Sequence, residues 1–200
     1  MPTRRSAPTL QGTRVVLRPP RRSDAAAFLA QAAKSRSLHR GLVHPPLTPA
    51  AYALYLERHR VTRDTPSNVA FLVVRRDDRT LAGVVNFSEI VRGVFQSAYV
   101  GYYAFAGMTG AAYMTEALAL ALDYAFRHEG LHRIEANVQP GNARSLALVE
   151  RIGFVREGYS RRYVKIAGRW RDHVRFAMLA EDWKARRLEL VRRHAGSHGK

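Results

Sequence analysis

The 200-residue sequence predicts an α+β fold, in which a mixed but mostly antiparallel central sheet is flanked by helices. Short apolar runs with strand composition and longer segments with helical periodicity follow one another in mixed order. Hydrophobic residues make up 46% of the chain, which is enough for the core of one domain. We expect residues 10–183 to form this domain, residues 1–9 to be a disordered tail, and residues 184–200 to be a basic terminal helix or tail.

Seven strands are expected. The segment Val69–Val74 is apolar throughout, which is typical of a buried strand, and a turn at Asp77-Asp78 follows it. Gly93 lies in the link between the next two strands, and Ala167-Gly168 connects the last two as a hairpin. The expected strands cover residues 15–19, 69–74, 81–90, 97–105, 134–138, 154–166 and 169–179.

Four helices are expected. Ser23-Asp24 is the predicted N-cap of the first, and Thr48 offers a capping hydroxyl before a proline at the first position of the second. The third has one broad apolar face, and Gly130 ends it. The expected helices cover residues 25–33, 50–60, 112–128 and 142–152.

Composition excludes several classes of protein. The chain has no cysteine, so thiol nucleophiles, disulfides and thiolate zinc sites are all ruled out. No run approaches about 18 consecutive apolar residues, so a membrane span is not expected. Residues 1–10 lack the apolar stretch of a secretion signal, and we expect a cytoplasmic protein. The histidines are scattered, which argues against a metal site.

The charge of the chain is strongly positive. There are 33 Lys+Arg against 16 Asp+Glu, giving a net charge of +17. Such a charge attracts polyanions, whether nucleic acid, a ribosome surface or a phosphate-rich cofactor. An arginine-rich genome explains the same composition, so charge by itself assigns no partner.

The segment from Asn137 to Phe154 carries the most specific signal. It predicts a strand that runs out to two asparagines, a short helix that starts near Asn142, and a stop at Gly153 before the next strand. This order of parts resembles the acyl-CoA-binding half of the GCN5-related N-acetyltransferases (GNAT). The resemblance implies a single GNAT-type domain with a V-shaped acyl-CoA cleft between two central strands. It also implies acetyl-CoA as the acyl donor and no metal.

A second part of the resemblance is a loop between strand 100–105 and the helix from about 112. In GNAT proteins this loop binds the pyrophosphate of the cofactor, and a helix N-terminus suits that task because its N–H groups are unpaired. The sequence departs from the usual pattern here, because Thr109, Ala112 and Met114 replace a basic or amide residue, a glycine and a small residue. The backbone donors survive these substitutions, although affinity for acetyl-CoA could be reduced.

Several segments point to one branch of the superfamily. Met114–Leu118, Leu131–Asn137, Gly153–Tyr159 and Gly168–Val174 look like the RimJ/RimL-like branch, which acetylates the N-terminal amines of ribosomal proteins. Within it, the likeness is to enzymes that modify an N-terminal alanine. The resemblance covers residues 15–183 and implies direct attack of the amine on the thioester in a ternary complex.

The reaction needs a neutral amine, an oxyanion donor and a proton for the sulfur. An α-amine of pKa about 7.7–8.0 is partly neutral at pH 7, so a strong base is not required. From the resemblance we assign Ser145 as the acid for the thiolate and Asn142 as the residue that orients it or the pantetheine arm. Helix capping is the alternative role of both residues. Glu89 is the candidate base, with Glu135 and Glu157 as less favoured carboxylates.

The cofactor-binding residues follow from the same resemblance. The strand at 102–104 is expected to contact pantetheine through its backbone, the loop at 107–113 to hold the pyrophosphate, and the 137–144 segment to complete the site. The candidates are Tyr102, Tyr103, Ala104, Gly107, Thr109, Gly110, Ala111, Ala112, Tyr113, Asn137, Asn142 and Arg144.

Two alternative functions stay open at this level. The first is a small-molecule amine or antibiotic acetyltransferase on the same fold. The second is a ribosome- or RNA-associated binding protein with weak catalysis, since arginines and aromatic residues alternate in the terminal hairpin. The packing of those aromatic residues inward is the ordinary explanation of that pattern, and any RNA contact through it would be nonspecific.

Overall fold

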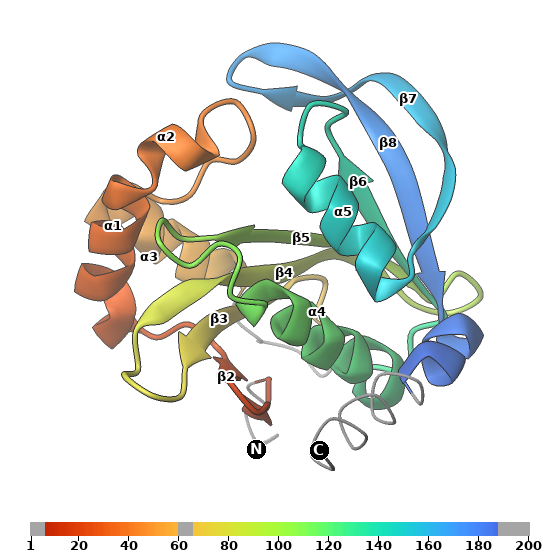
Figure 1. Ribbon diagram of the computed structural model, residues 1–200, viewed down its shortest axis with the longest axis horizontal. Helices are drawn as coiled ribbons and strands as arrows, with labels where there is room; N and C mark the ends of the chain where they lie inside the picture. The colour runs from red at the N-terminus through yellow and green to blue at the C-terminus, as the bar shows by residue number, and fades with distance from the viewer. Residues whose placement is uncertain (1–6, 60–65, 188–200) are drawn as a thin grey trace, which may run out of the picture.

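The computed structural model describes residues 7–59 and 66–187 (Figure 1). The sheet that these residues form has eight strands in the order β1-β2-β3-β4-β5-β6-β8-β7. All neighbours are antiparallel except β5 and β6, which are parallel. The expected single α+β domain is confirmed. The strands are β1 (Leu10–Gln11), β2 (Val15–Arg18), β3 (Val69–Arg75), β4 (Leu81–Val91), β5 (Ser97–Ala104), β6 (Arg133–Val138), β7 (Val155–Ile166) and β8 (Arg169–Leu179).

Helices cover both faces of the sheet. The α-helices are α1 (Ala25–Lys34), α2 (Arg36–His39), α3 (Pro49–Arg58), α4 (Tyr113–Asp123) and α5 (Ala143–Ile152). A 3-10 turn, Arg22–Asp24, precedes α1, and a π-helical turn, Tyr124–His128, continues α4. Residues 180–187 form a helical segment after β8. In Figure 1, α4 and α5 lie on one side of the sheet, whereas α1 and α2 lie at the left of the view, away from β7 and β8.

The core is divided by the sheet into two parts. Along β3, alternate side chains face opposite sides, as strand geometry requires. Phe71 and Val73 pack with α4 and α5 in the larger cluster, whereas Leu72 and Val74 pack with α1 and α3 in the smaller one. This arrangement explains why β3 is apolar at six consecutive positions and lacks polar alternation.

Local capping signals give different outcomes at different helices. Thr48 caps α3 as predicted, because its Oγ1 accepts from Ala51 N at 3.2 Å. Asp24 is the N-cap residue of α1, as predicted, but its side chain makes no capping bond to that helix. Its carboxylate instead accepts two hydrogen bonds from the Arg18 guanidinium at 2.6 and 2.7 Å. The charge-assisted pair outcompetes the cap.

Two elements were not expected from the sequence. The segment around α2 was predicted as loop, and β1 was assigned to no element. Long-range contacts hold α2 in place: Ser35 Oγ accepts from Ala106 N at 2.8 Å, and His39 Nε2 lies 2.8 Å from the Ala104 carbonyl. Both partners lie at the end of β5, so this short helix depends on tertiary contacts.

The predicted termini lie largely outside the described residues. Of the expected tail at 1–9, residues 1–6 are outside the described ranges, and Ala7 packs on the larger core cluster. Of the expected terminal segment, residues 184–187 are helical and 188–200 lie outside the described ranges. Among the described residues, no helix has the length and apolar character needed to cross a membrane. The same residues contain no group of three or more metal-ligating side chains.

Candidate active site

Strands β5 and β6 part from one another in the middle of the sheet (Figure 1). Their parallel pairing is limited to three residue pairs, which end at Tyr99 with Glu135. From there β5 continues to Ala104 and β6 continues to Val138 without pairing to each other. The β5 edge that faces the gap therefore has no neighbouring strand there, and its backbone groups are available to a ligand. The expected V-shaped cleft between two central strands is confirmed.

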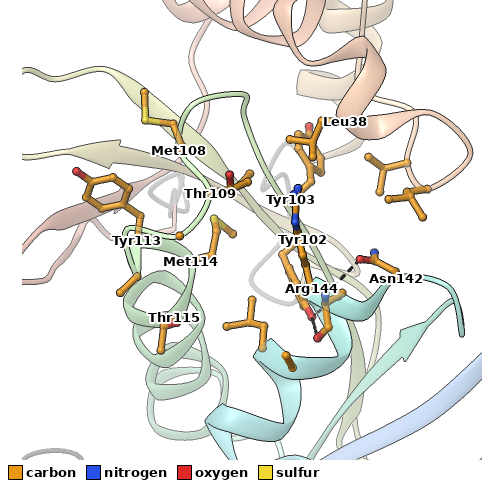
Figure 2. A pocket seen from close by; sticks show the side chains of 18 of the residues that line it. Leu38, Tyr102, Tyr103, Met108, Thr109, Tyr113, Met114, Thr115, Asn142 and Arg144 are labelled. Atoms are coloured by element: carbon orange, nitrogen blue, oxygen red, sulfur yellow. Dashed lines mark hydrogen bonds between the residues drawn. The ribbon is translucent and has the colours of Figure 1, made fainter.

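A cavity of about 530 Å³ lies at this parting (Figure 2). Its walls come from the end of β5, the following loop, the N-terminal part of α4 and one face of α5, with α2 on one side. The volume falls in the range of about 300–1,000 Å³ that is typical of ligand sites. The lining residues are Leu38, His39, Leu42, Val43, Tyr102, Tyr103, Ala104, Met108, Thr109, Gly110, Ala112, Tyr113, Met114, Thr115, Asn142, Arg144, Ser145, Ala147, Leu148 and Arg151.

The loop before α4 is shaped by residues in left-handed backbone conformations. Gly107 has φ +78° and Gly110 has φ +87°, which glycine adopts without steric cost. Ala112 adopts φ +59° at the N-cap of α4, where a Cβ is strained. No side chain caps this helix end, so the first-turn N–H groups that face the cavity lack a side-chain acceptor. The loop therefore provides backbone donors and a positive dipole end for an anion.

The first turn of α5 holds the hydroxyl of Ser145 beside Tyr102 of β5. Asn142 is the N-cap, and its Oδ1 accepts from Ser145 N at 3.2 Å. Ser145 Oγ lies 2.6 Å from the Tyr102 hydroxyl, which reaches it from the middle of the cleft strand. Burial raises the pKa of Tyr102 to about 12. Tyr102 thus stays protonated at any physiological pH.

His39 closes the cavity on the side of α2. Its Nε2 lies 2.8 Å from the Ala104 carbonyl, and its ring meets Tyr103 edge to face at 5.1 Å between centroids. Burial lowers the pKa of His39, and the bond to the carbonyl only partly opposes this change. The neutral ring must donate to the carbonyl through Nε2, because a carbonyl oxygen can only accept. His39 therefore anchors α2 to the end of the cleft strand.

The structure brings most of the predicted site residues together. Ten of the fourteen different residues line the cavity: Tyr102, Tyr103, Ala104, Thr109, Gly110, Ala112, Tyr113, Asn142, Arg144 and Ser145. Gly107 and Ala111 belong to the same loop but do not line the cavity. Ala111 accepts a hydrogen bond from Arg14 Nη1 through its carbonyl at 3.3 Å. The remaining two candidates, Glu89 and Asn137, lie elsewhere.

Glu89 and Asn137 are directed away from the cavity. Glu89 is exposed, has φ +50° and lies where the β4–β5 pairing is irregular. The cavity lies near the other end of β4, where Gly83 pairs with Ala104. Asn137 lies on β6, where Ala136 and Val138 pack on the core cluster that includes α5. Side chains alternate along a strand, so Asn137 points to the opposite face. Its Oδ1 is buried and has no hydrogen-bond partner among the described residues.

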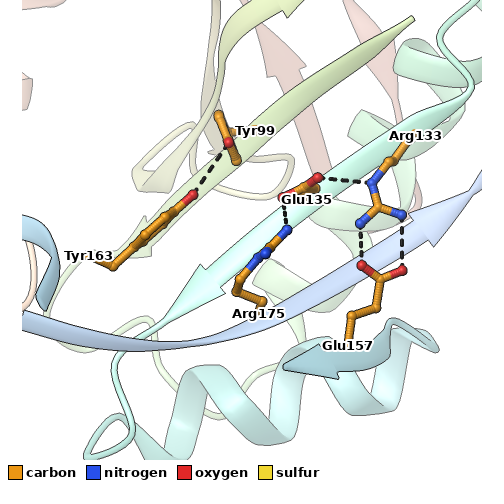
Figure 3. Close-up of polar contacts among 6 residues, drawn as sticks. All are labelled: Tyr99, Arg133, Glu135, Glu157, Tyr163 and Arg175. Atoms are coloured by element: carbon orange, nitrogen blue, oxygen red, sulfur yellow. Dashed lines mark hydrogen bonds and ion pairs between the residues drawn. The ribbon is translucent and has the colours of Figure 1, made fainter. Parts of the chain in front are cut away.

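The carboxylates of Glu135 and Glu157 belong to an ion-pair network (Figure 3). Arg133 Nε donates to Glu135 Oε1 at 2.9 Å, and Arg133 Nη1 donates to Glu157 Oε1 at 3.0 Å. Arg175 lies 3.5 Å from the other oxygen of Glu135. The Arg133 hydrogen bonds lower the pKa of Glu157, despite a smaller opposing effect of burial. A carboxylate stabilised in this way is a poor proton acceptor.

Some cavity residues were not predicted from the sequence. Leu38, His39, Leu42 and Val43 come from the α2 segment, which carries no local signal of a site. Arg151 was also missed, although it follows Arg144 by two helical turns and therefore shares its face of α5. That spacing, in a helix already assigned to the cofactor site, was the signal that could have identified it.

Comparison with known proteins gives the following relatives. A family model described as an acetyltransferase (GNAT) domain matches residues 14–155. The [ribosomal protein uS5]-alanine N-acetyltransferase of Escherichia coli is 45% identical over 107 residues, which are 54% of this chain and 55% of that protein. The chain thus spans about half the length of this relative. A Bacillus subtilis protein named as a probable N-acetyltransferase, YjcK, is 38% identical over 136 residues, or 66% of this chain and 75% of that one.

A solved structure extends the likeness over nearly the whole chain. RimJ of Mycobacterium smegmatis, solved in complex with CoA-disulfide, superposes with a TM-score of 0.82 at 28% identity. The superposition covers 93% of this chain and 96% of that protein. The shared fold therefore extends over nearly the whole chain.

Proposed function

Because the chain belongs to the GNAT acetyltransferase family, we propose that it transfers the acetyl group of acetyl-CoA to the N-terminal amine of a ribosomal protein, at an alanine or a similarly small residue. Acetyl-CoA is the acyl donor of this family. The observation that carries the proposal is the cavity at the parting of β5 and β6, with an uncapped helix end on one wall and the Ser145 hydroxyl on the other. The acceptor is inferred from the names of the relatives, and a ribosomal-protein acceptor would place the enzyme in the cytoplasm.

The residues present suit acetyl-CoA as a ligand. The backbone donors of residues 109–113 would hold the pyrophosphate, and the free edge of β5 near Tyr102 would pair with the amides of the pantetheine arm. Arg144 and Arg151 add positive charge on the α5 side of the cavity. Once bound, the thioester supplies an activated acetyl group and a thiolate leaving group. Gly107 and Ala111 would contribute by shaping the loop.

Catalysis would rest on positioning and on one hydroxyl. The amine would attack directly in a ternary complex, and its pKa of about 7.7–8.0 leaves enough of it neutral near pH 7. Ser145 would donate its hydroxyl proton to the departing sulfur, and Asn142 would fix Ser145 by capping α5. Glu89 would not act as the base, because its exposed side chain is not part of the cavity wall.

Release of free thiol tests the proposal directly. Acetyl-CoA is mixed with a peptide that begins with alanine, and a disulfide dye reports the CoA that is formed. The chain has no cysteine, so the protein gives no background. We expect release with the free peptide and none with the same peptide blocked at its N-terminus. Release with small amines alone would instead favour a small-molecule acceptor, and acetyl-CoA binding without any release would remove the proposed transfer.

The role of Ser145 gives the first prediction for a variant. Ser145→Ala removes the donor to the thiolate, and a hydrogen bond to a charged group contributes about 1.5–3 kcal/mol. We therefore expect kcat to fall about 10- to 100-fold while KM for acetyl-CoA stays within about twofold. Ser160→Ala, on β7 outside the cavity, is the matched control. Equal kcat values for the two variants would show that the Ser145 hydroxyl takes no part in the reaction.

We also propose that the β7–β8 hairpin contacts ribosomal RNA without base specificity. Residues 155–179 contain seven Lys+Arg and two acidic residues. Both acids already have partners: Glu157 binds Arg133, and Asp172 accepts from the Tyr159 hydroxyl at 2.6 Å. The basic side chains at Arg156, Arg161, Arg162, Lys165 and Arg169 are exposed. Affinity for RNA should then fall steeply with salt, and a binding titration between 50 and 200 mM salt would check it.

A further inference from the structure

The side chain of Tyr102 lies in the cavity beside Ser145, but the proposed acetyl transfer does not yet use it. It lies on β5 and projects into the cavity toward the first turn of α5 (Figure 2). Its hydroxyl is 2.6 Å from Ser145 Oγ and 3.3 Å from the Ser145 carbonyl oxygen. The two residues are 43 positions apart in the sequence, so the contact exists only because the parting strand and the helix meet here.

The direction of the short hydrogen bond follows from acidity and distance. A phenol, with a pKa of about 10, is a far better donor than an aliphatic hydroxyl. The shorter contact is to Oγ, and the contact to the carbonyl oxygen is long for a bond between oxygen atoms. Tyr102 therefore donates to Ser145 Oγ. Because that lone pair is occupied, the proton of Ser145 is directed away from Tyr102 and is free to point into the cavity.

We propose that Tyr102 is a positioning residue for acyl transfer, which orients the Ser145 hydroxyl toward the thioester sulfur and polarises it. This inference rests on the proposed function for its chemistry. It gives the side chain of Tyr102 a role in the reaction, in addition to the contact of its backbone with pantetheine. A hydroxyl that accepts a strong hydrogen bond becomes a better donor in turn. Burial, which keeps the pKa of Tyr102 at about 12, maintains the donor across the working pH range.

The proton balance leaves Tyr102 unchanged. The C–N bond forms while the C–S bond breaks, and the electron pair of the broken bond goes to sulfur. The sulfur takes the proton of Ser145, and the proton lost by the amine nitrogen restores the Ser145 hydroxyl through solvent. Tyr102 keeps its own proton throughout, so the thiol and the amide are the only products.

A double-mutant cycle tests whether Tyr102 acts through Ser145. Tyr102→Phe removes one hydroxyl and keeps the ring, and we expect kcat to fall about tenfold with KM for acetyl-CoA within about twofold. In a Ser145→Ala background the same change should have no further effect. Tyr124→Phe is the control, because it also deletes a buried hydroxyl that is hydrogen-bonded, here to Glu129, beyond the C-terminal end of α4. An equal loss in both backgrounds would overturn the inference.

A second readout needs no acetyl transfer. An alkyl thiol has a pKa of about 8.5, and a donor directed at sulfur stabilises the thiolate. Calorimetry with CoA from pH 7 to 9.5 should therefore show affinity rising about tenfold in the wild type, about threefold or less in Tyr102→Phe, and not at all in Ser145→Ala. Acetyl-CoA, which has no free thiol, should give a flat profile. A flat wild-type profile, or a Tyr102→Phe profile equal to wild type, would refute the inference.

The acetyl-CoA profile is the reference for any effect of the other titratable groups in the cavity. Those that line the cavity are His39, Arg144, Arg151, Tyr102, Tyr103 and Tyr113. Burial lowers the pKa of His39, so it is neutral throughout the range, and arginines stay charged. Burial raises the pKa of Tyr103. The experiments also separate the two proposals: a protein that shows the predicted CoA profile but does not acetylate the alanine peptide would lose the proposed acceptor and keep the orientation of Ser145 by Tyr102 toward sulfur.

Discussion

Gly83 of β4 is the position at which a single methyl group should damage the cavity from outside. A Cβ built there would lie 2.5 Å from the Tyr103 carbonyl oxygen, 2.7 Å from Met114 Sδ and 3.2 Å from Ala104 Cα. All three neighbours line the cavity, yet Gly83 does not. An alanine at this position would therefore press on the cleft strand and on the first turn of α4 together.

The size of the effect follows from these distances. Carbon contacts are comfortable at about 3.5–4.0 Å, so the Tyr103 carbonyl would have to move by about 1 Å. Overpacking of this kind costs about 1–3 kcal/mol. We expect Gly83→Ala to lower the free energy of unfolding by that amount. Movement of the β5 backbone on its β4 side also displaces its opposite edge, which would pair with pantetheine. We also expect acetyl-CoA affinity to fall about tenfold or more.

Urea unfolding and calorimetric titration with acetyl-CoA measure the two effects. Gly158→Ala on β7 is the matched control, since its Cβ would meet nothing within 4 Å and its φ is not positive. We expect the control to bind acetyl-CoA like the wild type and to be equally stable or slightly more stable. The reasoning is refuted if Gly83→Ala matches Gly158→Ala in affinity, since β4 packing would then not shape the cavity.

Two further predictions concern stability. Burial alone raises the pKa of Asp24, but the bonds from Arg18 and the Arg21 N–H outweigh it and hold this pKa below its usual 3.8. Asp24→Asn should therefore lower the free energy of unfolding by about 2–3 kcal/mol near pH 7. The extra stability of the wild type over Asp24→Asn is complete above the pKa of Asp24 in the unfolded chain, and it is lost as pH falls through the lower pKa of the folded protein. Denaturant titrations should therefore show a larger difference in the free energy of unfolding at pH 7 than at pH 2. Ala112→Gly removes the strain of a Cβ in a left-handed backbone conformation, so it should raise the free energy of unfolding by about 0.5–1 kcal/mol. A decrease in the same denaturant titration would contradict this reasoning.

The sequence determined those features whose causes lie within a few residues. Helix α5 has its Asn142 cap and its left-handed Gly153 stop where the local pattern predicts them. The β7–β8 turn uses Ala167 and Gly168, both with positive φ, so the hairpin is also a local consequence. Thr48 caps α3 for the same reason. Each of these signals operates through backbone conformation or one nearby hydrogen bond, which neighbouring residues are sufficient to specify.

Only the tertiary structure decided which side chains meet across the cavity. The Asp24 carboxylate binds Arg18 and does not cap α1. The hydrogen-bond partners of Ser35 and His39, which hold α2, lie at and just after the end of β5. Glu89 and Asn137 fall outside the cavity because a bulge and the alternation of strand side chains direct them elsewhere. The Tyr102–Ser145 contact arises where β5 and β6 stop pairing, and no local sequence pattern predicts that these strands separate after Tyr99 and Glu135. That point is set by the packing of the whole sheet against its helices, which is a property of long-range contacts.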